Sequence, residues 1–202
     1  MQAHLPNSGR MTELLVPGAK AYVSPAPPAA VRKTAWDLTL IEYRELLVSV
    51  DSRLPGALLR EAIGAAALPE FDGFRLVRQE VVFEDSRIDL LLSGEQGLCY
   101  LEAKSVNLVE GRTALFPDAP TERGRKHLGS LARAARQGHR AAVAFVVQRA
   151  DAHELSPHRS ADPLFCDALK EAVEVGVEAY AYRCRVSRRE IAIVESMPMK
   201  LV

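Results

Sequence analysis

The sequence of 202 residues predicts an α/β (α+β) protein, in which a mixed sheet flanked by helices is preceded by a small all-β region. Three observations lead to this fold class. The first fifty residues hold only short β-type segments separated by proline and glycine. The remainder follows the order helix, three-strand meander, helix, strand, helix, strand, which is typical of a sheet covered by helices on its faces. Residues 141–148 form an apolar run of the kind that lies in a sheet centre.

The N-terminal segments 19–23, 34–42 and 45–50 are rich in residue types that favour strands. Short strands of this kind predict a small barrel or sheet. We therefore divide the chain into an N-terminal domain over residues 1–50 and a larger domain over residues 51–202.

The larger domain begins with a helix predicted over residues 54–67, where apolar residues recur at helical spacing before the stop signal of Pro69. Three consecutive strands are predicted next, over residues 75–83, 86–92 and 98–106. The turns between them are rich in acidic residues, serine and glycine.

A second helix is predicted over residues 121–137, with Thr121 as its candidate N-cap and Gly138 at its end. Its apolar stripe consists of Gly124, Leu128, Leu131, Ala132 and Ala135. The sheet strand over residues 141–148 follows.

Asp162 and Pro163 supply the N-cap and first turn of a third helix that extends to about residue 175. Residues 177–186 are predicted to return as a strand, with a short final strand over residues 190–194. A helix-turn-helix repressor fits this region poorly, because the segment after Gly176 has the pattern of a strand and not of a recognition helix.

Composition narrows the class of protein. Lys and Arg together number 26, as do Asp and Glu, so the net charge is zero and argues against coating nucleic acid by bulk charge. The cysteines Cys99, Cys166 and Cys184 are odd in number and far apart, which indicates reduced structural thiols. No apolar run has the length of a membrane span and no signal core is present, so we expect a cytoplasmic protein with no membrane partner.

Charge is nevertheless uneven along the chain. Residues 121–140 contain one acid, Glu122, and six bases: Arg123, Arg125, Lys126, Arg133, Arg136 and Arg140. Such a stripe can contact phosphates, although a solvated helix face is the commoner meaning of a charge run.

The most informative motif is Asp89 in an apolar strand, followed thirteen residues later by Glu102-Ala103-Lys104 in the next strand. Charged residues in such strands are typical of a metal-dependent phosphodiesterase. Residues two apart in a strand share a face, so Glu102 and Lys104 are predicted to project together, with Tyr100 beside them. A carboxylate from the neighbouring strand would complete an oxygen site for Mg²⁺ or Mn²⁺.

The chemistry needs these residue types. Two carboxylates hold a cation that polarises a phosphate and acidifies water, and the ammonium of Lys104 stabilises the developing charge. The carbonyl of Ala103 is a candidate further ligand, and a fourth oxygen would come from Glu61 or Glu80. We favour Glu61, because a helix packed over the sheet can lean a carboxylate toward the site. The alternative to a metal site is a purely structural role for these residues. Glu102 and Lys104 would then form an ion pair on an edge strand, and Asp89 would be a buried polar group with its hydrogen bonds satisfied.

Other segments are less specific. Residues 110–119 are predicted to be a long loop that positions substrate or closes over a metal, and Asp118 belongs to that loop because it follows the Glu-x-Lys motif. His127 is a candidate general acid or phosphate contact, with a plain surface histidine as the alternative. Thr121, by capping its helix, would aim backbone N–H groups at a phosphate.

Several motifs together resemble one known family, that of sugar fermentation stimulation protein A of bacteria and archaea. The matching motifs are His4-Leu5-Pro6-Asn7-Ser8-Gly9-Arg10-Met11, Ser86-Arg87-x-Asp89 within residues 78–92, Glu102-Ala103-Lys104-Ser105-Val106, Phe116-Pro117-Asp118-Ala119, Thr121-Glu122-Arg123-Gly124-x-x-His127-Leu128 and Asp162-Pro163-x-Phe165. They extend over nearly the whole chain.

The resemblance implies an N-terminal OB-like β-barrel joined to a PD-(D/E)xK restriction-endonuclease-like mixed sheet. Members of the family usually begin well upstream with two further strands, so either the start is mis-assigned or the barrel is incomplete. Carried over by position, the nuclease-like acids fall on Asp89 and Glu102 and the lysine on Lys104. Pro55-Gly56, Ala103 and Pro120 depart mildly from the family pattern.

The resemblance implies DNA binding that is largely independent of sequence. Together with the acids and the lysine, we expect a DNA-binding protein with a nuclease-like site for Mg²⁺ or Mn²⁺. The resemblance also implies a link to the regulation of sugar (maltose) metabolism. An active Mg²⁺-dependent endonuclease or exonuclease is the alternative. The expected nucleic-acid contacts are Arg10, Arg87, Thr121, Arg123, Arg125, Lys126 and His127.

Overall fold

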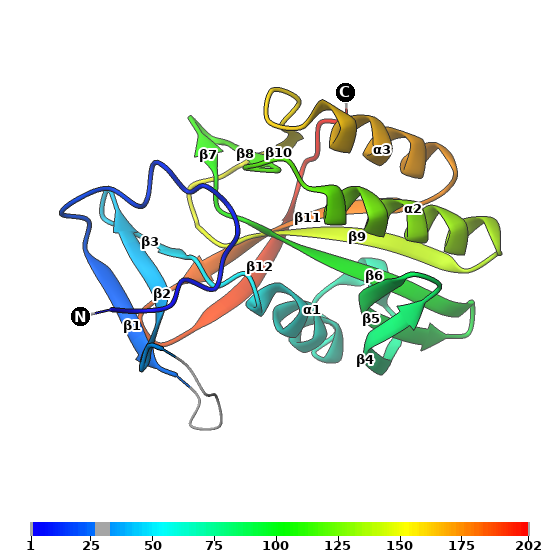
Figure 1. Ribbon diagram of the computed structural model, residues 1–202. Coiled ribbons are helices and arrows are strands. Elements are labelled where there is room, and N and C mark those ends of the chain that lie inside the picture. The colour runs from blue at the N-terminus through cyan, green and yellow to red at the C-terminus, as the bar shows by residue number, and fades with distance from the viewer. Residues whose placement is uncertain (1, 27–32, 202) are drawn as a thin grey trace.

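The computed structural model describes residues 2–26 and 33–201, and its largest element is a six-stranded mixed sheet (Figure 1). In spatial order the strands are β12 (Ile191–Met197), β11 (Glu178–Val186), β9 (Arg140–Val147), β6 (Gly97–Val106), β5 (Ser86–Gly94) and β4 (Arg75–Phe83). β6, β9 and β11 are parallel, and the remaining pairs are antiparallel. This confirms the predicted mixed sheet with the apolar strand β9 inside it.

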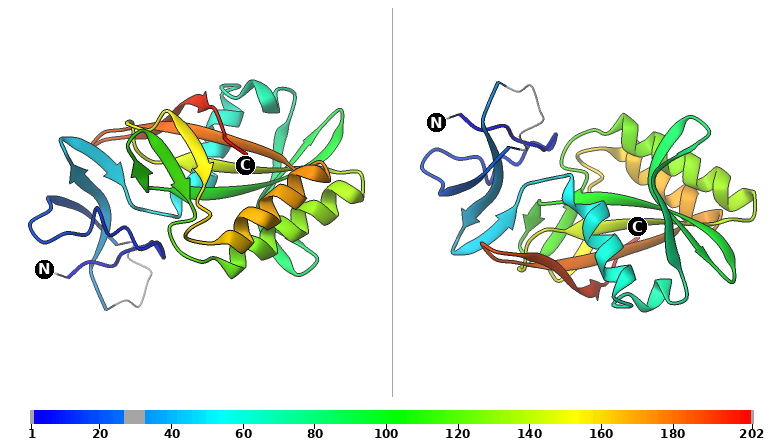
Figure 2. Two further views of the ribbon diagram at one scale, coloured as in Figure 1. Left: turned by 90° about the horizontal axis from the view of Figure 1, so that it is seen from above. Right: turned by 90° about the horizontal axis from the view of Figure 1, so that it is seen from below.

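Helices cover both faces of this sheet (Figure 2). α2 (Glu122–Arg136) and α3 (Pro163–Glu174) pack on one face, where Leu128, Leu131 and Phe165 join a large apolar cluster with side chains of the sheet. α1 (Leu54–Gly64) and the short 3-10 helix η1 (Pro69–Phe71) pack on the other face. No helix of the described residues is long and apolar enough to span a membrane.

The N-terminal region forms a separate three-stranded antiparallel sheet of β1 (Ala21–Pro25), β2 (Trp36–Tyr43) and β3 (Leu46–Ser49). Its own small core contains Met11, Leu14, Ile41, Val48 and Val50. Within residues 2–26 and 33–201 these strands do not close into a barrel.

A third sheet was not predicted. β7 (Val109–Glu110) and β8 (Thr113–Phe116) form a tight hairpin, and β10 (Glu154–Pro157) pairs with β8 in parallel. The prediction of a long loop over residues 110–119 is therefore wrong in its first half. The strands are very short, and the partner of β8 lies about forty residues further along the chain, so no local pattern reveals the pairing.

Both predicted helix caps are confirmed. The Thr121 hydroxyl accepts a hydrogen bond from the Gly124 amide at 3.0 Å, and the carboxylate of Asp162 accepts one from the Phe165 amide at 3.0 Å. The second oxygen of Asp162 accepts from the Thr121 amide and from Arg125, both at 2.8 Å. One aspartate therefore caps α3 and also fixes the start of α2.

Candidate metal centre

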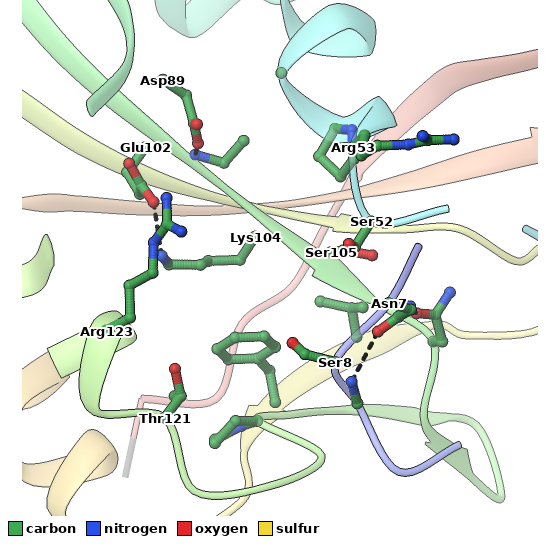
Figure 3. A pocket seen from close by; sticks show the side chains of 18 of the residues that line it. Asn7, Ser8, Ser52, Arg53, Asp89, Glu102, Lys104, Ser105, Thr121 and Arg123 are labelled. Carbon is green, nitrogen blue, oxygen red and sulfur yellow. Dashed lines mark hydrogen bonds and ion pairs between the residues drawn. The ribbon is translucent and has the colours of Figure 1, made fainter. Parts of the chain in front are cut away.

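A cleft of about 630 Å³ lies where the N-terminal region meets the six-stranded sheet (Figure 3). Asn7, Ser8 and Gly9 form one wall, and residues 115–121 with Arg123 form another. The start of α1 contributes Arg53 and the residues after it. Asp89, Glu102, Ala103 and Lys104 also line the cleft, so the structure brings the predicted acids and lysine together.

Asp89 lies at a break in the strand pairing. β5 pairs with β6 only from Leu90 onward, and the Asp89 carboxylate accepts a hydrogen bond from the Ala103 amide at 2.8 Å. Ile88 and Leu90 belong to core clusters on opposite faces of the sheet although they are two residues apart. The two faces of β5 therefore exchange at Asp89, and its carboxylate, in place of a backbone carbonyl of β5, accepts the hydrogen bond from β6.

Glu102 and Lys104 share the face of β6 that lies under α2, as their spacing predicts. Lys104 Nζ donates to Glu102 Oε1 at 2.7 Å, and His127 Nδ1 of α2 hydrogen-bonds to the same oxygen. Glu102 is 2% exposed, Lys104 9% and His127 5%. The alternative of an edge-strand ion pair is wrong in its placement, because β6 lies between β5 and β9 inside the sheet.

The two carboxylates have different electrostatic environments. Burial, and then the nearby charge of Glu102, raise the pKa of Asp89 to about 6. Burial also acts to raise the pKa of Glu102, but Lys104 and His127 outweigh it and hold that pKa below its ordinary value. Asp89 is therefore the carboxylate of the pair that holds a proton more readily, and Glu102 is the one that loses its proton first as pH rises.

One atom of this cluster has no hydrogen-bond partner among the described residues: the buried Oε2 of Glu102. A buried carboxylate oxygen in that state is costly unless something else satisfies it. A hard divalent cation would do so, with Asp89 as the second carboxylate. The described residues contain no group of three or more His, Cys, Asp or Glu side chains suited to a metal, so further ligands would be a backbone oxygen such as that of Ala103, and water.

The structure does not bring Glu61 to this site. α1 buries Leu58, Leu59, Ala62 and Ile63, which places Glu61 on the exposed side of the helix and away from the cleft lining. Glu80 of β4, the candidate that we ranked second, does line the cleft.

The basic stretch around α2 is largely neutralised by acids from other elements. Arg125 pairs with Asp162 at 2.8 Å and Lys126 with Asp85 at 3.3 Å. Arg133 binds the acidic turn between β4 and β5, and Arg140 binds Glu178.

The remaining predicted contacts are divided between cleft and surface. Arg123 is exposed and extends toward Glu102 and Lys104 in the cleft (Figure 3). Thr121 lines the cleft as a helix cap. Arg10 is exposed and follows the lining residue Gly9. Arg87 is exposed beside Glu80, with 3.6 Å between their charged groups.

His127 is neither a surface histidine nor a cleft-lining residue. It is buried beneath α2 against Glu102, and its other ring nitrogen, Nε2, accepts from Arg123 Nε at 3.4 Å. A signal for this burial is present in the sequence. His127 follows Gly124 by three residues and precedes Leu131 by four, so it falls within the apolar stripe of the helix.

Two further features of the cleft were not anticipated. The Met11 amide donates to the carboxylate of Asp118 at 2.7 Å, which fixes the N-terminal segment against the loop after β8. Arg53 lines the cleft while its guanidinium binds Asp51 and Asp37 at 2.6 and 2.9 Å. The contacts of Met11 with Asp118 and of Arg53 with Asp37 join different elements, so spacing within one element cannot reveal them.

Comparison with known proteins agrees with this architecture. The family model described as the sugar fermentation stimulation protein RE domain matches residues 53–190, and that of the SfsA N-terminal OB domain matches residues 1–50. A sugar fermentation stimulation protein homolog of Desulforamulus reducens is 45% identical over 199 residues, covering 98% of this chain and 82% of that protein. The homolog of Moorella thermoacetica is 45% identical over 200 residues, covering 98% of this chain and 86% of that protein.

A solved structure is similar over the same extent. SfsA of Pyrococcus furiosus, described as a complex with Ca²⁺, superposes with a TM-score of 0.91 at 32% sequence identity, covering 98% of this chain and 85% of that one. The N-terminal region, an open sheet in this structure, is thus matched as an OB domain. By sequence, by domain models and by structure, the chain belongs to the sugar fermentation stimulation protein family.

Proposed function

We propose that this protein binds DNA in the cleft and holds a divalent cation, Mg²⁺ or Mn²⁺, at Asp89, Glu102 and the backbone oxygen of Ala103. The observation that carries the proposal is the buried Oε2 of Glu102, which has no partner in the described structure although a second carboxylate lies on the neighbouring strand. The Ca²⁺ complex of the Pyrococcus furiosus relative supports it. Ca²⁺, Mg²⁺ and Mn²⁺ all favour oxygen ligands.

The cleft suits the phosphate backbone better than base edges. Besides Lys104, its cationic side chains are Arg53, just before α1, and Arg123 in the first turn of α2, and Thr121 caps α2 beside the loop. Contacts of this kind fix nucleic acid in position without reading its sequence. We therefore expect binding that is independent of sequence and weakens as salt rises, because phosphate contacts release counterions. A regulatory role in sugar metabolism is proposed from the family alone.

A second candidate function, phosphodiester hydrolysis, is favoured by the position of Lys104. Its ammonium lies in the cleft lining at 2.7 Å from Glu102 Oε1, while it stays 9% exposed. A bound cation would polarise the phosphate and acidify water there. Lys104 would stabilise the charge that develops on the phosphate, and Arg123 would orient the strand.

A binding and cleavage assay tests both functions. The protein and its Asp89→Asn and Lys104→Ala variants are incubated with labelled duplex, single-stranded and branched DNA, in Mg²⁺, Mn²⁺ or EDTA. Glu61→Gln is the matched control, because it removes an exposed carboxylate outside the cleft. Cutting that needs metal and is lost in both site variants would establish a nuclease. Retention without cutting would establish a binding protein, and no retention on any substrate would contradict the proposal.

A further inference from the structure

His127 has contacts that the proposed function leaves unexplained. It is 5% exposed and absent from the cleft lining, yet its ring touches three charged side chains of the site. Nδ1 hydrogen-bonds to Glu102 Oε1 and lies 3.5 Å from Lys104 Nζ, and Nε2 is 3.4 Å from Arg123 Nε. A buried histidine between a lysine and an arginine has no evident role in contacting phosphate directly.

These contacts select one neutral form of the ring. Arg123 Nε is a donor, so Nε2 must accept and carries no proton. The proton then resides on Nδ1 and is donated to Glu102 Oε1. Lys104 also donates to that oxygen, which makes the 3.5 Å approach of Lys104 to Nδ1 a contact between two donors rather than a hydrogen bond.

The consequence falls on Glu102. Its Oε1 receives both donors, Nδ1–H of His127 and the ammonium of Lys104, while its Oε2 receives none. Two donors on one oxygen hold the carboxylate in a single rotamer and leave the other oxygen for a different partner. A ligand fixed in this way binds a cation at a lower entropic cost than one that must be ordered on binding.

We infer that His127 is a positioning residue: its Nδ1–H holds Glu102 so that Oε2 is presented to a divalent cation, and its Nε2 ties Arg123 to the same unit. The inference rests on the proposed metal site and deepens it. It also corrects the sequence-based expectation of a direct phosphate contact. The imidazole of His127 thereby joins Arg123, which is exposed in the cleft, to the buried carboxylate of Glu102 at the floor of the cleft.

Substitution of His127 by asparagine or by glutamine tests the contacts of its two ring nitrogens one at a time. His127→Asn places an N–H near the position of Nδ1, and His127→Gln places an amide near the position of Nε2, whereas His127→Leu keeps neither. His139→Leu is the matched control, because this half-buried histidine packs on the Tyr100 ring without touching the carboxylates. Ca²⁺ binding to each full-length variant is measured by calorimetry at fixed pH, with thermal unfolding in EDTA as the check on folding.

We expect His127→Leu and His127→Gln to bind Ca²⁺ about 10- to 100-fold more weakly, and His127→Asn to recover most of the affinity. If His127 only filled space in the core, the Asn variant would not bind Ca²⁺ more tightly than the Gln variant. Equal Ca²⁺ affinity in all variants, or recovery by Gln but not Asn, would overturn the inference while leaving the metal site intact. If the unmodified protein binds no Ca²⁺, the metal site itself is wrong and the inference is overturned with it.

Discussion

The charge of Asp89 opposes folding. Its pKa is raised to about 6, chiefly by burial and secondly by Glu102, so the folded protein holds this proton more tightly than the unfolded chain does. Stability contributed by the proton is therefore present below the ordinary pKa and is lost as pH rises toward 6. Without a bound cation, the full cost of burying the charged Asp89 carboxylate is present above about pH 6.

We therefore expect Asp89→Asn to be more stable than the natural protein by about 1–3 kcal/mol in EDTA at about pH 8. The amide oxygen can still accept the hydrogen bond of the Ala103 amide. Urea unfolding at about pH 8 and about pH 4.5 checks this, and the difference between the proteins should shrink at the lower pH. The idea is wrong if the variant is less stable at both values, or if Glu61→Gln behaves in the same way.

The charge of Lys104, in contrast to that of Asp89, stabilises the folded protein. Removing its ammonium leaves the carboxylate of Glu102 buried with His127 as its remaining donor. Breaking a buried pair in this way costs about 3–5 kcal/mol. We expect Lys104→Met to lose stability on that scale and the double variant Glu102→Gln with Lys104→Met to regain much of it. Additive losses in this double-mutant cycle would show that the two charges do not interact.

At the scale of elements, Asp162 joins α2 to α3. Burial acts to raise its pKa, but the amides of Thr121 and Phe165 and the guanidinium of Arg125 outweigh burial and lower it. The stabilisation is present above the ordinary pKa of an aspartate and is lost as pH falls through the lowered folded value. The two helices should therefore loosen together in acid.

Asp162→Ala is expected to cost about 2–3 kcal/mol, since it removes the cap of α3 and the acceptor for the first turn of α2. Thr121→Ala is the comparison, because it removes one cap alone. Hydrogen exchange of both helices in each variant gives the measurement. Loss of protection confined to α3 in Asp162→Ala would contradict the proposed link to α2.

The accuracy of the sequence-based predictions also varied by element. α2, α3 and β9 were predicted correctly because caps, glycine stops and an apolar run are local signals. β7, β8 and β10 were missed because they are stabilised by pairing between distant segments. Glu61 was favoured over Glu80 because the sequence does not show which side of α1 faces the sheet near the cleft.

In the candidate site, too, local features could be predicted from the sequence and contacts between distant segments could not. The shared face of Glu102 and Lys104 follows from strand geometry, and their approach to Asp89 follows from adjacent strands. Phosphate contact by the basic stripe of α2 stays a prediction. The ion pairs of this stripe with Asp85 and Asp162 were not predicted, because these acids belong to other elements. Charge partners across the fold are invisible to a count along the chain.

At the scale of the whole molecule, the cleft exists only where the two domains meet. Asn7 Nδ2 donates to the Val50 carbonyl of the N-terminal domain at 3.0 Å and to Asn107 of the larger domain at 3.1 Å, so it ties the N-terminal wall to both. Gln148, at the end of β9, is fully buried at the same junction. These side-chain amides therefore help to fix the relative position of the domains, together with the contacts of Met11 with Asp118 and of Arg53 with Asp37.

Gln148 is the most deeply buried of these amides, so its replacement tests the junction directly. Its side chain accepts from Ser49 Oγ at 3.0 Å and donates to the Asp51 carbonyl at 3.1 Å and to Ser105 Oγ at 2.7 Å. Methionine has a similar volume but no hydrogen-bonding amide, so Gln148→Met leaves buried polar groups on both domains unsatisfied. Each such group costs about 1–3 kcal/mol.

We expect Gln148→Met to lower the melting temperature and to split one calorimetric transition into two, because the N-terminal core of Met11, Ile41 and Val48 then unfolds separately. Gln137→Met, at the exposed end of α2, is the matched control and should leave the transition unchanged. If DNA binds in the cleft as we propose, its retention should also fall with the junction variant, since residues of both regions line the cleft. A single, unshifted transition would show that the amide network does not hold the domains together.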